Sequence, residues 1–340
     1  MNTSLTFHDV MRWTDDQCRE FLESQRWPDG AICPKCGAVE PYTLTRKSAS
    51  KNSVRSLYKC RKCRKQFTAT VGTIFEDSHI PLNKWFAAIY LMCSSKKGVS
   101  AHQIHRTLGV TYKSAWFMAH RVREAMREKD GSLLSGVIEA DETYVGRKGR
   151  RGHPVAKWEQ INERERLDAE ARGLTLRRKS GPKRGQPHPR TEKAVVFGMM
   201  ERGGRVRTMK IAAPTAEGIK PIMIRNIAVK DSYLMTDGHH AYRLIRHEMP
   251  HSIINHEIEY VRGDVHTQGI ENYWSIVKRS IYGIHHHVAE NYLPSYLSER
   301  DYVFNSRKIA DAERFAALMG QTRGRLLWYC RTPQVENPYA

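Results

Sequence analysis

The sequence predicts a multidomain α+β protein: an N-terminal zinc ribbon and a helix-turn-helix, followed by an α/β domain with a mixed sheet. Two CxxC pairs lie in the first 65 residues, amphipathic helical patterns follow to residue 128, and strand-like runs alternate with helical ones from residue 137. A chain of 340 residues has room for two or three domains. The expected segments are a helical start at 1–30, the ribbon at 31–78, the helix-turn-helix at 79–130, the α/β domain at 131–310 and a C-terminal tail at 311–340.

The charge balance favours a polyanionic partner. There are 56 Lys and Arg residues against 36 Asp and Glu, a formal net charge of +20, and phosphate contacts made by such residues release condensed counterions. Nucleic acid is the first expectation, and a solvated basic surface is the alternative. No basic amphipathic anchor, secretory signal or apolar run of about 20 residues is evident, so we expect a cytoplasmic protein without membrane partners.

Four of the seven cysteines form the two CxxC pairs, Cys33 with Cys36 and Cys60 with Cys63. Each pair closes a tight turn that aims two thiolates at one point, and two such turns complete a tetrahedral site that suits Zn²⁺. A redox role is the competing interpretation of CxxC. Because so small a module has little core, we expect the metal to supply much of its folding energy.

Basic residues surround the second CxxC pair and lead us to expect DNA contact by the ribbon. They are Arg61, Lys62, Arg64 and Lys65. The alternative is a solvated rim. At the N-terminus, Thr14 with Gln17 three residues later is the pattern of a capping box at the start of a helix.

The stretch 98–126 is typical of a helix, a short turn and a second helix. Ser100 is the expected N-cap of the first helix, and Gly109 lies in the turn. The second helix starts near residue 111, where a recognition helix meets base edges. The residues expected there to contact DNA are Thr111, Tyr112, Lys113 and Ser114. A plain helical hairpin is the alternative.

Two aspartates follow strand-like runs in the second half of the chain, Asp141 in "IEADETY" and Asp237 in "YLMTDGHH". Ligand-binding groups gather at the ends of strands in α/β sheets, and paired carboxylates suit Mg²⁺ or Mn²⁺. Glu271 and Lys278 share a stripe of the predicted helix "IENYWSIVKR", beside its apolar stripe. Glu271 is thus placed to complete a carboxylate trio and Lys278 to contact a phosphate. An ordinary strand end, a turn and a surface pair are the alternatives.

Other residues have weaker signals. Glu142 points away from Asp141 on a strand, so it is expected to support the site or face solvent. His266 precedes the helix and is a candidate DNA contact, or else forms a hydrogen bond where that helix starts; Arg279 is a further DNA candidate. Three consecutive histidines in "GIHHHV" cannot share one point, which favours DNA contact or exposure. The segment 147–193 has 15 Lys and Arg against 6 Asp and Glu, typical of a solvated insertion or a DNA clamp.

Five stretches in order, among them "RWPDGAICPKCG", "ADETYVGRKG", "TDGHHAY" and "HTQGIENYWSIVKRSIYG", resemble the DDE transposases of bacterial insertion sequences, in the branch with an N-terminal zinc ribbon. The resemblance runs from about residue 8 to residue 310. It implies an RNase H-like catalytic core, two Mg²⁺ or Mn²⁺ ions, and cleavage and strand transfer at transposon ends. By motif, Asp141, Asp237 and Glu271 are the implied acidic residues, with Lys278 completing the E-x6-K pattern.

The implied partners are the inverted-repeat ends and target DNA, bound by an oligomer of the chain in the bacterial nucleoid. Two positions depart from the family pattern: Gln268 stands where Asn is common, and the insertion at 147–193 is long. Two other functions fit the same motifs. One is a DNA-binding regulator whose core has lost catalysis, and the other is a structure-specific nuclease that cuts without joining.

Overall fold

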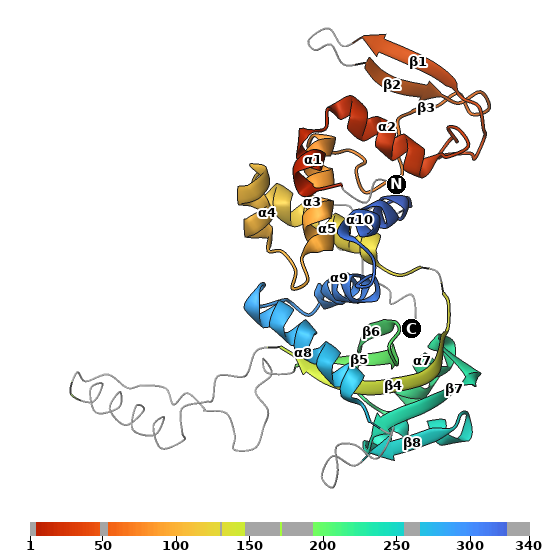
Figure 1. Ribbon diagram of the computed structural model, residues 1–340, viewed down its shortest axis with the longest axis vertical. Helices are drawn as coiled ribbons and strands as arrows, with labels where there is room; N and C mark the ends of the chain where they lie inside the picture. Colours follow the sequence, from red (N-terminus) through yellow and green to blue (C-terminus); the bar gives the residue numbers. More distant parts are fainter. Residues whose placement is uncertain are drawn as a thin grey trace.

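The computed structural model describes residues 5–47, 54–129, 131–146, 193–254 and 266–324, and the single residue Ala171. Nearly all of the predicted insertion at 147–193 and the end of the chain from 325 lie outside these residues. The described parts are stacked along one axis: a small sheet at one end, a group of helices in the middle and a larger sheet at the other end (Figure 1). No helix in this described part is long and apolar enough to cross a membrane.

The small sheet has three antiparallel strands in the order β1-β2-β3, Tyr42–Lys47, Val54–Lys59 and Gln66–Phe67. Its core is a group of aromatic rings: Tyr58 stacks on Phe67 at 5.5 Å, and Trp27 meets both edge-on. Trp27 ends helix α2, so these contacts attach the ribbon to the helices.

Six helices form the middle of the molecule, α1 Phe7–Arg12, α2 Asp15–Arg26, α3 Leu82–Ser94, α4 Ala101–Leu108, α5 Tyr112–Met126 and α10 Asp311–Gly320. The predicted capping box of Thr14 with Gln17 is present, and Ser100 caps α4 through the N–H of Gln103. Gly109 takes the left-handed conformation that ends α4, with φ +59°, which glycine adopts without steric cost.

Helix α10 lies in the segment 311–340 that the sequence suggested was a tail. Its residues Phe315, Leu318 and Met319 are spaced at i, i+3 and i+4 and are buried among the N-terminal helices. Phe315 stacks on Phe21 at 5.8 Å, and Arg314 donates to the carbonyl of Cys93. The chain therefore returns from the second half to complete the core of the first, a long-range pairing that local sequence patterns do not reveal.

The larger sheet is mixed, as predicted, with the order β6-β5-β4-β7-β8. Its strands are β4 Leu134–Val145, β5 Ala194–Glu201, β6 Val206–Ile211, β7 Ile227–Asp237 and β8 His251–Ile254. β5 is antiparallel to β4 and β6, whereas β7 is parallel to its two neighbours, β4 and β8. β7 therefore ends beside residue 141 of β4, which runs on to Val145.

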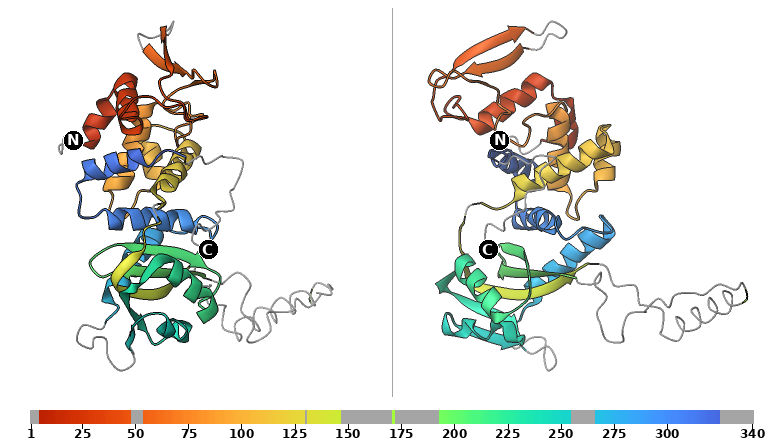
Figure 2. Two further views of the ribbon diagram at one scale, coloured as in Figure 1. Left: turned by 90° about the vertical axis from the view of Figure 1, so that its right-hand side faces the viewer. Right: turned by 180° about the vertical axis from the view of Figure 1, so that it is seen from behind.

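Helices cover both faces of this sheet, with α7 Ala216–Asn226 on one face, and α8 Gln268–Gly283 and α9 Leu293–Asn305 on the other (Figures 1 and 2). Alternate residues of β5 serve the two cores: Phe197 packs with α7, and Val196 packs with α8. The stretch 240–247 forms two short 3₁₀ turns, His240–Tyr242 and Ile245–His247.

Helix α9 joins the sheet to the helices. On one side, its Asp301 accepts hydrogen bonds from the backbone and hydroxyl of Thr208 on β6. On the other side, its buried Glu299 pairs with Arg123 of α5 at 2.7 Å and with Arg300 at 2.5 Å. The second helix of the predicted DNA-binding pair is thus connected rigidly to the sheet domain.

Candidate functional site

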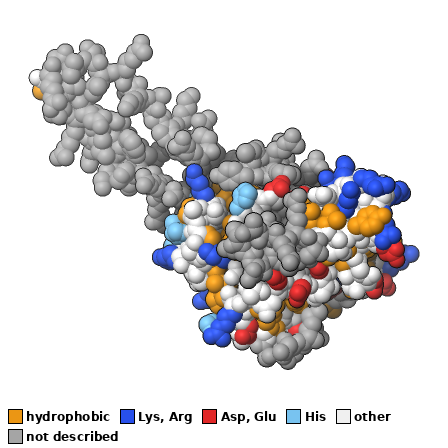
Figure 3. All heavy atoms as spheres, turned by 90° about the horizontal axis from the view of Figure 1, so that it is seen from above, with side chains coloured by type: hydrophobic (Ala, Val, Ile, Leu, Met, Phe, Trp, Pro, Cys, Tyr) orange, Lys and Arg blue, Asp and Glu red, His pale blue; other side chains and the backbone are white. Residues whose placement is uncertain are grey.

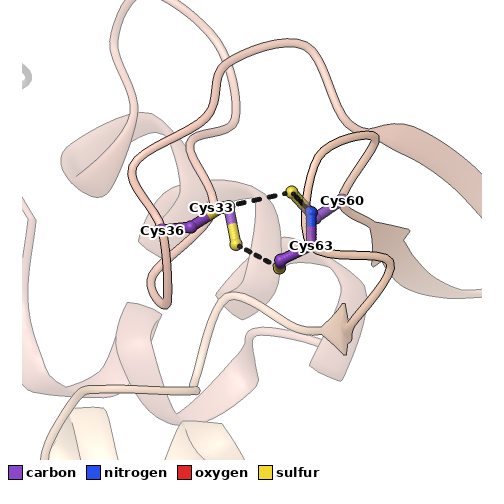
Figure 4. A group of neighbouring side chains, drawn as sticks. All are labelled: Cys33, Cys36, Cys60 and Cys63. Atoms are coloured by element: carbon purple, nitrogen blue, oxygen red, sulfur yellow. Dashed lines mark hydrogen bonds between the residues drawn. The ribbon is translucent and has the colours of Figure 1, made fainter.

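The four cysteines of the two CxxC pairs converge on one point (Figure 4). The sulfur of Cys33 lies 3.7 Å from that of Cys63, and the sulfur of Cys36 lies 3.5 Å from that of Cys60. Zn–S bonds of about 2.3 Å in a tetrahedron require S···S distances of roughly 3.8 Å. The arrangement therefore fits Zn²⁺, and a structural role for that ion follows from the closed set of four protein ligands.

Two similar backbone turns position these thiols. The N–H of Gly37 bonds to the carbonyl of Cys33, and the N–H of Arg64 bonds to that of Cys60. Gly37 and Arg64 both have positive φ, +74° and +58°. The N–H of Cys63 points at the sulfur of Cys60, and this hydrogen bond lowers the pKa of the Cys60 thiol to about 6. Such a thiol is readily deprotonated, as a metal ligand must be.

The four basic residues beside the second pair are all exposed, namely Arg61, Lys62, Arg64 and Lys65. The guanidinium of Arg61 lies over the ring of Tyr42 at 4.6 Å, and that ring is itself 49% exposed. Lys and Arg side chains also gather along one rim of the molecule in the view from the ribbon end (Figure 3). The ribbon thus presents accessible positive charge, which the sequence predicted.

In the α4–α5 pair, Thr111 and Ser114 form the N-terminal cap of α5. The hydroxyl of Thr111 accepts the N–H of Ser114, and the two hydroxyls are 2.9 Å apart. Tyr112 and Lys113 are exposed, and the ring of Tyr112 stacks on His102 of α4 at 4.3 Å. Of the four residues predicted to contact DNA, two therefore have exposed side chains, and the side chains of the other two form the helix cap.

The two aspartates lie side by side where the pairing of β4 with β7 ends. The last residue pair between these parallel strands is Ala140 with Thr236, so Asp141 and Asp237 come directly after it. Paired residues of parallel strands point to the same face. Strand pairing thus brings together two aspartates that are 96 positions apart in the sequence.

Asp141 is held in an environment that disfavours its charge. Burial first, and then the charges of Asp237 and Glu142, raise the pKa of Asp141 to about 7. The indole N–H of Trp274 donates to Oδ2 of Asp141 over 2.9 Å, which opposes this shift. A cation placed between the two aspartates would remove the repulsion that raises this pKa.

Glu142 supports the site from the other face of β4. Its side chain is only 7% exposed, accepts a hydrogen bond from the buried Tyr242 and lies 3.2 Å from Nδ1 of His239. The backbone N–H of His239 in turn donates to Oδ1 of Asp237. Glu142 and Asp237 therefore share one neighbour, and the supporting role that the sequence suggested fits better than solvent exposure.

Glu139 was missed by sequence reasoning. It is buried, and its carboxylate accepts the backbone N–H of Ile270 at 3.0 Å and the Arg202 guanidinium at 3.1 Å. An added Cβ at Gly269 would lie 2.6 Å from the same carboxylate, so only glycine fits there. Glu139 thereby anchors the first turn of α8 to β4. Its position two residues before Asp141, on the same face, was the available signal.

Glu271 lies in that anchored first turn of α8. It is exposed, and its Oε1 accepts the hydroxyl of Thr267 at 2.9 Å. Within the described chain, the cysteine group is the sole set of three or more potential ligand side chains whose atoms all lie within 4.8 Å of one another. Asp141, Asp237 and Glu271 do not form so close a set in this structure.

The remaining predicted residues lie further along the same helix or before it. Lys278 is exposed and lines a pocket next to the end of β4. Arg279 is exposed and folds back on Ser275. His266 lies 3.6 Å from Glu139, and its carbonyl accepts from Arg202. These contacts agree with a role for His266 at the start of the helix, the alternative to DNA contact.

Comparisons with known proteins identify the family. Residues 133–305, half of the chain, match the ISXO2-like transposase domain, and residues 13–66 match the transposase zinc-ribbon domain. A protein described as an uncharacterized protein in transposable element ISH50 of Halobacterium salinarum is 28% identical over 291 residues, which span 84% of this chain and 88% of that protein. No solved structure matches. The chain therefore belongs to the ISXO2-like transposase family and carries the N-terminal zinc ribbon of such transposases.

Proposed function

We propose that this transposase binds the terminal inverted repeats of its insertion sequence and performs metal-dependent cleavage and strand transfer with Asp141, Asp237 and Glu271. The observation that carries the proposal is the meeting of Asp141 and Asp237 after the last pair of β4 and β7, next to the helix that carries Glu271. The family match supplies the reaction class.

An RNase H-like core is the proposed architecture of this domain. The order β6-β5-β4-β7-β8, with an antiparallel β4-β5-β6 meander followed by two parallel strands, supports it. The proposed ligands thus come from the central strand, its parallel neighbour and a helix packed on the sheet. Ligands at the carboxyl ends of strands are the usual arrangement in α/β sheets.

The carboxylates fit a pair of Mg²⁺ or Mn²⁺ ions. Burial and the neighbouring charges of Asp237 and Glu142 raise the pKa of Asp141, and hard oxygen ligands suit these ions. When bound, the ions supply an activated water or 3′-hydroxyl and stabilise the leaving oxygen of the phosphodiester. Glu271 is exposed at the end of an anchored helix, so it can turn toward the aspartates on binding.

The protein's own groups have defined tasks in this proposal. Trp274 orients Asp141 through its indole N–H, and Glu139 fixes the start of α8 to β4. Lys278, two helical turns from Glu271, binds a backbone phosphate of the DNA about 10 Å further along. Each of these groups positions charge or substrate before the reaction begins.

The ribbon and the α4–α5 pair are proposed to hold the inverted repeats. The α4–α5 pair acts as a helix-turn-helix that places Tyr112 and Lys113 in the major groove, and the basic rim of the ribbon contacts the phosphates. Synapsis of two ends requires at least two copies of the chain, so a homo-oligomer is expected on DNA. Such a protein acts in the cytoplasm on chromosomal DNA.

An assay with labelled element ends and Mg²⁺ tests the proposal. The wild-type protein should cleave the ends and join them to a target, whereas Asp141→Ala should bind the ends and do neither. Cleavage without joining would identify a nuclease instead. End binding by wild type without any cleavage would identify a regulator. Inverted repeats flanking the gene, with short target duplications outside them, would support transposition independently.

A further inference from the structure

A pocket of about 430 Å³ lies between the end of β4 and the last turns of α8. Its polar and aromatic lining comes from Tyr144 on β4, Lys193 before β5, Lys278 and Tyr282 on α8, and His286 and His287 after it. Small-molecule sites commonly range from about 300 to 1,000 Å³, so the volume suits a group of the size of a nucleotide.

The walls of the pocket are built by specific contacts. The hydroxyl of Tyr282 donates to the carbonyl of Gly146 at 3.0 Å and accepts the N–H of the same residue at 3.1 Å. This double hydrogen bond ties the last full turn of α8 to the end of β4. The position of the Tyr282 ring is therefore set before any ligand binds.

The three consecutive histidines divide between two tasks. His285 turns inward, where its ring meets that of Tyr296 edge-on at 4.7 Å. His286 takes a left-handed backbone conformation, with φ +58°, and both His286 and His287 line the pocket. A strained non-glycine residue at this turn is a feature that functional sites often show. This arrangement agrees with the expectation that three consecutive histidines cannot all face one point.

The chemistry of the lining selects an anion with a planar group. Lys193 and Lys278 line the pocket, and no Asp or Glu is among the described residues that line it. Tyr282 is 42% exposed, which leaves ring surface free for stacking, whereas the side chain of Tyr144 lies on the face of β4 opposite to that of Asp141. Positive charge together with exposed aromatic rings is the combination that binds unpaired nucleotides.

We propose that this pocket takes one unpaired nucleotide of the DNA substrate, with its base against Tyr282 and its phosphate held by Lys193 and Lys278. Gly146, to which Tyr282 is bonded, lies five residues from Asp141 along β4, about 16 Å at 3.3 Å per residue. That is about five nucleotide steps of a duplex strand at 3.4 Å each. The captured nucleotide thus lies a few steps from the bond to be cut.

The inference rests on the proposed function, because it places a DNA strand across Asp141. It adds a source of substrate selectivity: DNA that is unpaired near the cut site should bind better than an intact duplex. Unpairing costs least where the base is already unpaired, so an overhang or flap is the favoured ligand.

The test compares binding of the full chain to two DNAs from the element end, in Ca²⁺ so that binding is read without turnover. One is a blunt duplex, and the other carries a single-nucleotide flap a few steps from the end, with 2-aminopurine as the flap base. We expect tighter binding of the flap DNA by about tenfold and a change in 2-aminopurine fluorescence on stacking. Equal dissociation constants for the two DNAs would overturn the proposal.

Three variants separate the pocket from general DNA binding. Tyr282→Ala should abolish the preference for flap DNA, Tyr282→Phe should keep it because the ring remains, and Tyr233→Ala, an exposed tyrosine on β7, should leave it unchanged. If Tyr282→Ala weakens both DNAs equally, the pocket assignment is wrong. In the wild-type protein, no preference for flap DNA together with intact strand transfer would refute the pocket alone, and a preference without strand transfer would refute the proposed reaction alone.

Discussion

The indole N–H of Trp274 donates to Oδ2 of Asp141 across 2.9 Å, joining helix α8 to a carboxylate of β4. Trp274 itself is nearly buried and packs against Gly198, where any larger residue would collide with its ring. The proposed third ligand, Glu271, lies one turn earlier on the same helix. Trp274 is therefore a positioning residue for two of the three proposed metal ligands.

Trp274→Phe should keep most of the packing and remove the donor. A hydrogen bond to a charged group contributes about 1.5–3 kcal/mol, so we expect end cleavage to slow by roughly tenfold or more. In the wild-type protein this hydrogen bond lowers the pKa of Asp141. Its loss should raise that pKa and so move the pH profile of cleavage to higher pH. Trp85→Phe, which removes a comparable indole hydrogen bond to Ser78, is the control. An unchanged pH profile would show that Trp274 only packs.

Asp141→Asn should stabilise the metal-free protein at pH 8. The pKa of Asp141 is about 7 in the folded protein and 3.8 in the unfolded chain. Between these values the folded state binds the extra proton, so wild-type stability falls as pH rises through this window. The amide avoids that loss, which is on the order of a few kcal/mol at pH 8 and small near pH 4.

Urea unfolding of the two proteins at pH 8 and pH 5, without Mg²⁺, measures the effect. The exposed Asp231→Asn variant serves as the control and should match wild type at both values. A gain in stability that is the same at pH 5 and pH 8 would mean that the carboxylate is not the destabilising group.

Cys60→Ser should remove zinc from the ribbon and unfold it, since one of four ligands is lost from a module with a small core. Metal analysis should give about one zinc per wild-type chain and much less in the variant. Cys18→Ala, a change at a buried cysteine of α2 outside the cluster, should keep its zinc. Full zinc content in Cys60→Ser would refute the four-thiolate site.

Lys113→Ala should weaken DNA binding and change its dependence on salt. Removing one phosphate contact reduces the slope of log K against log salt concentration by about one. Lys220→Ala is a suitable control, because Lys220 lies on α7 and pairs with Glu248, far from the α4–α5 pair. Because Lys113 is proposed to enter the major groove, its loss should relax the sequence preference as well. An unchanged slope together with an unchanged sequence preference would remove Lys113 from the interface.

Local signals in the sequence were sufficient for several parts of the molecule. The CxxC spacing predicted the cysteine cluster. The caps at Thr14 and Ser100 could be predicted because each joins residues three positions apart, and both are confirmed. The strand end at Asp237 was also placed well, whereas β4 runs on past Asp141 to Val145. A strand end is marked locally by the change from apolar residues to polar ones.

Features that depend on distant segments could not be predicted in the same way. Helix α10 completes the N-terminal core through Phe315, and nothing near it in sequence indicates that destination. Glu139 resembles any acidic residue in a strand until the start of α8 is seen to bond to it. Likewise, the inward turn of His285 depends on its packing against α9.

Manganese binding tests the central claim most directly. The zinc-loaded wild-type protein, bound to element-end DNA, should take up two Mn²⁺ per chain, and its electron paramagnetic resonance spectrum should show two coupled ions. Asp237→Ala should lose that coupled signal while still binding the DNA. A wild-type protein that binds no Mn²⁺ pair on DNA, or an Asp237→Ala variant with an unchanged spectrum, would contradict the account.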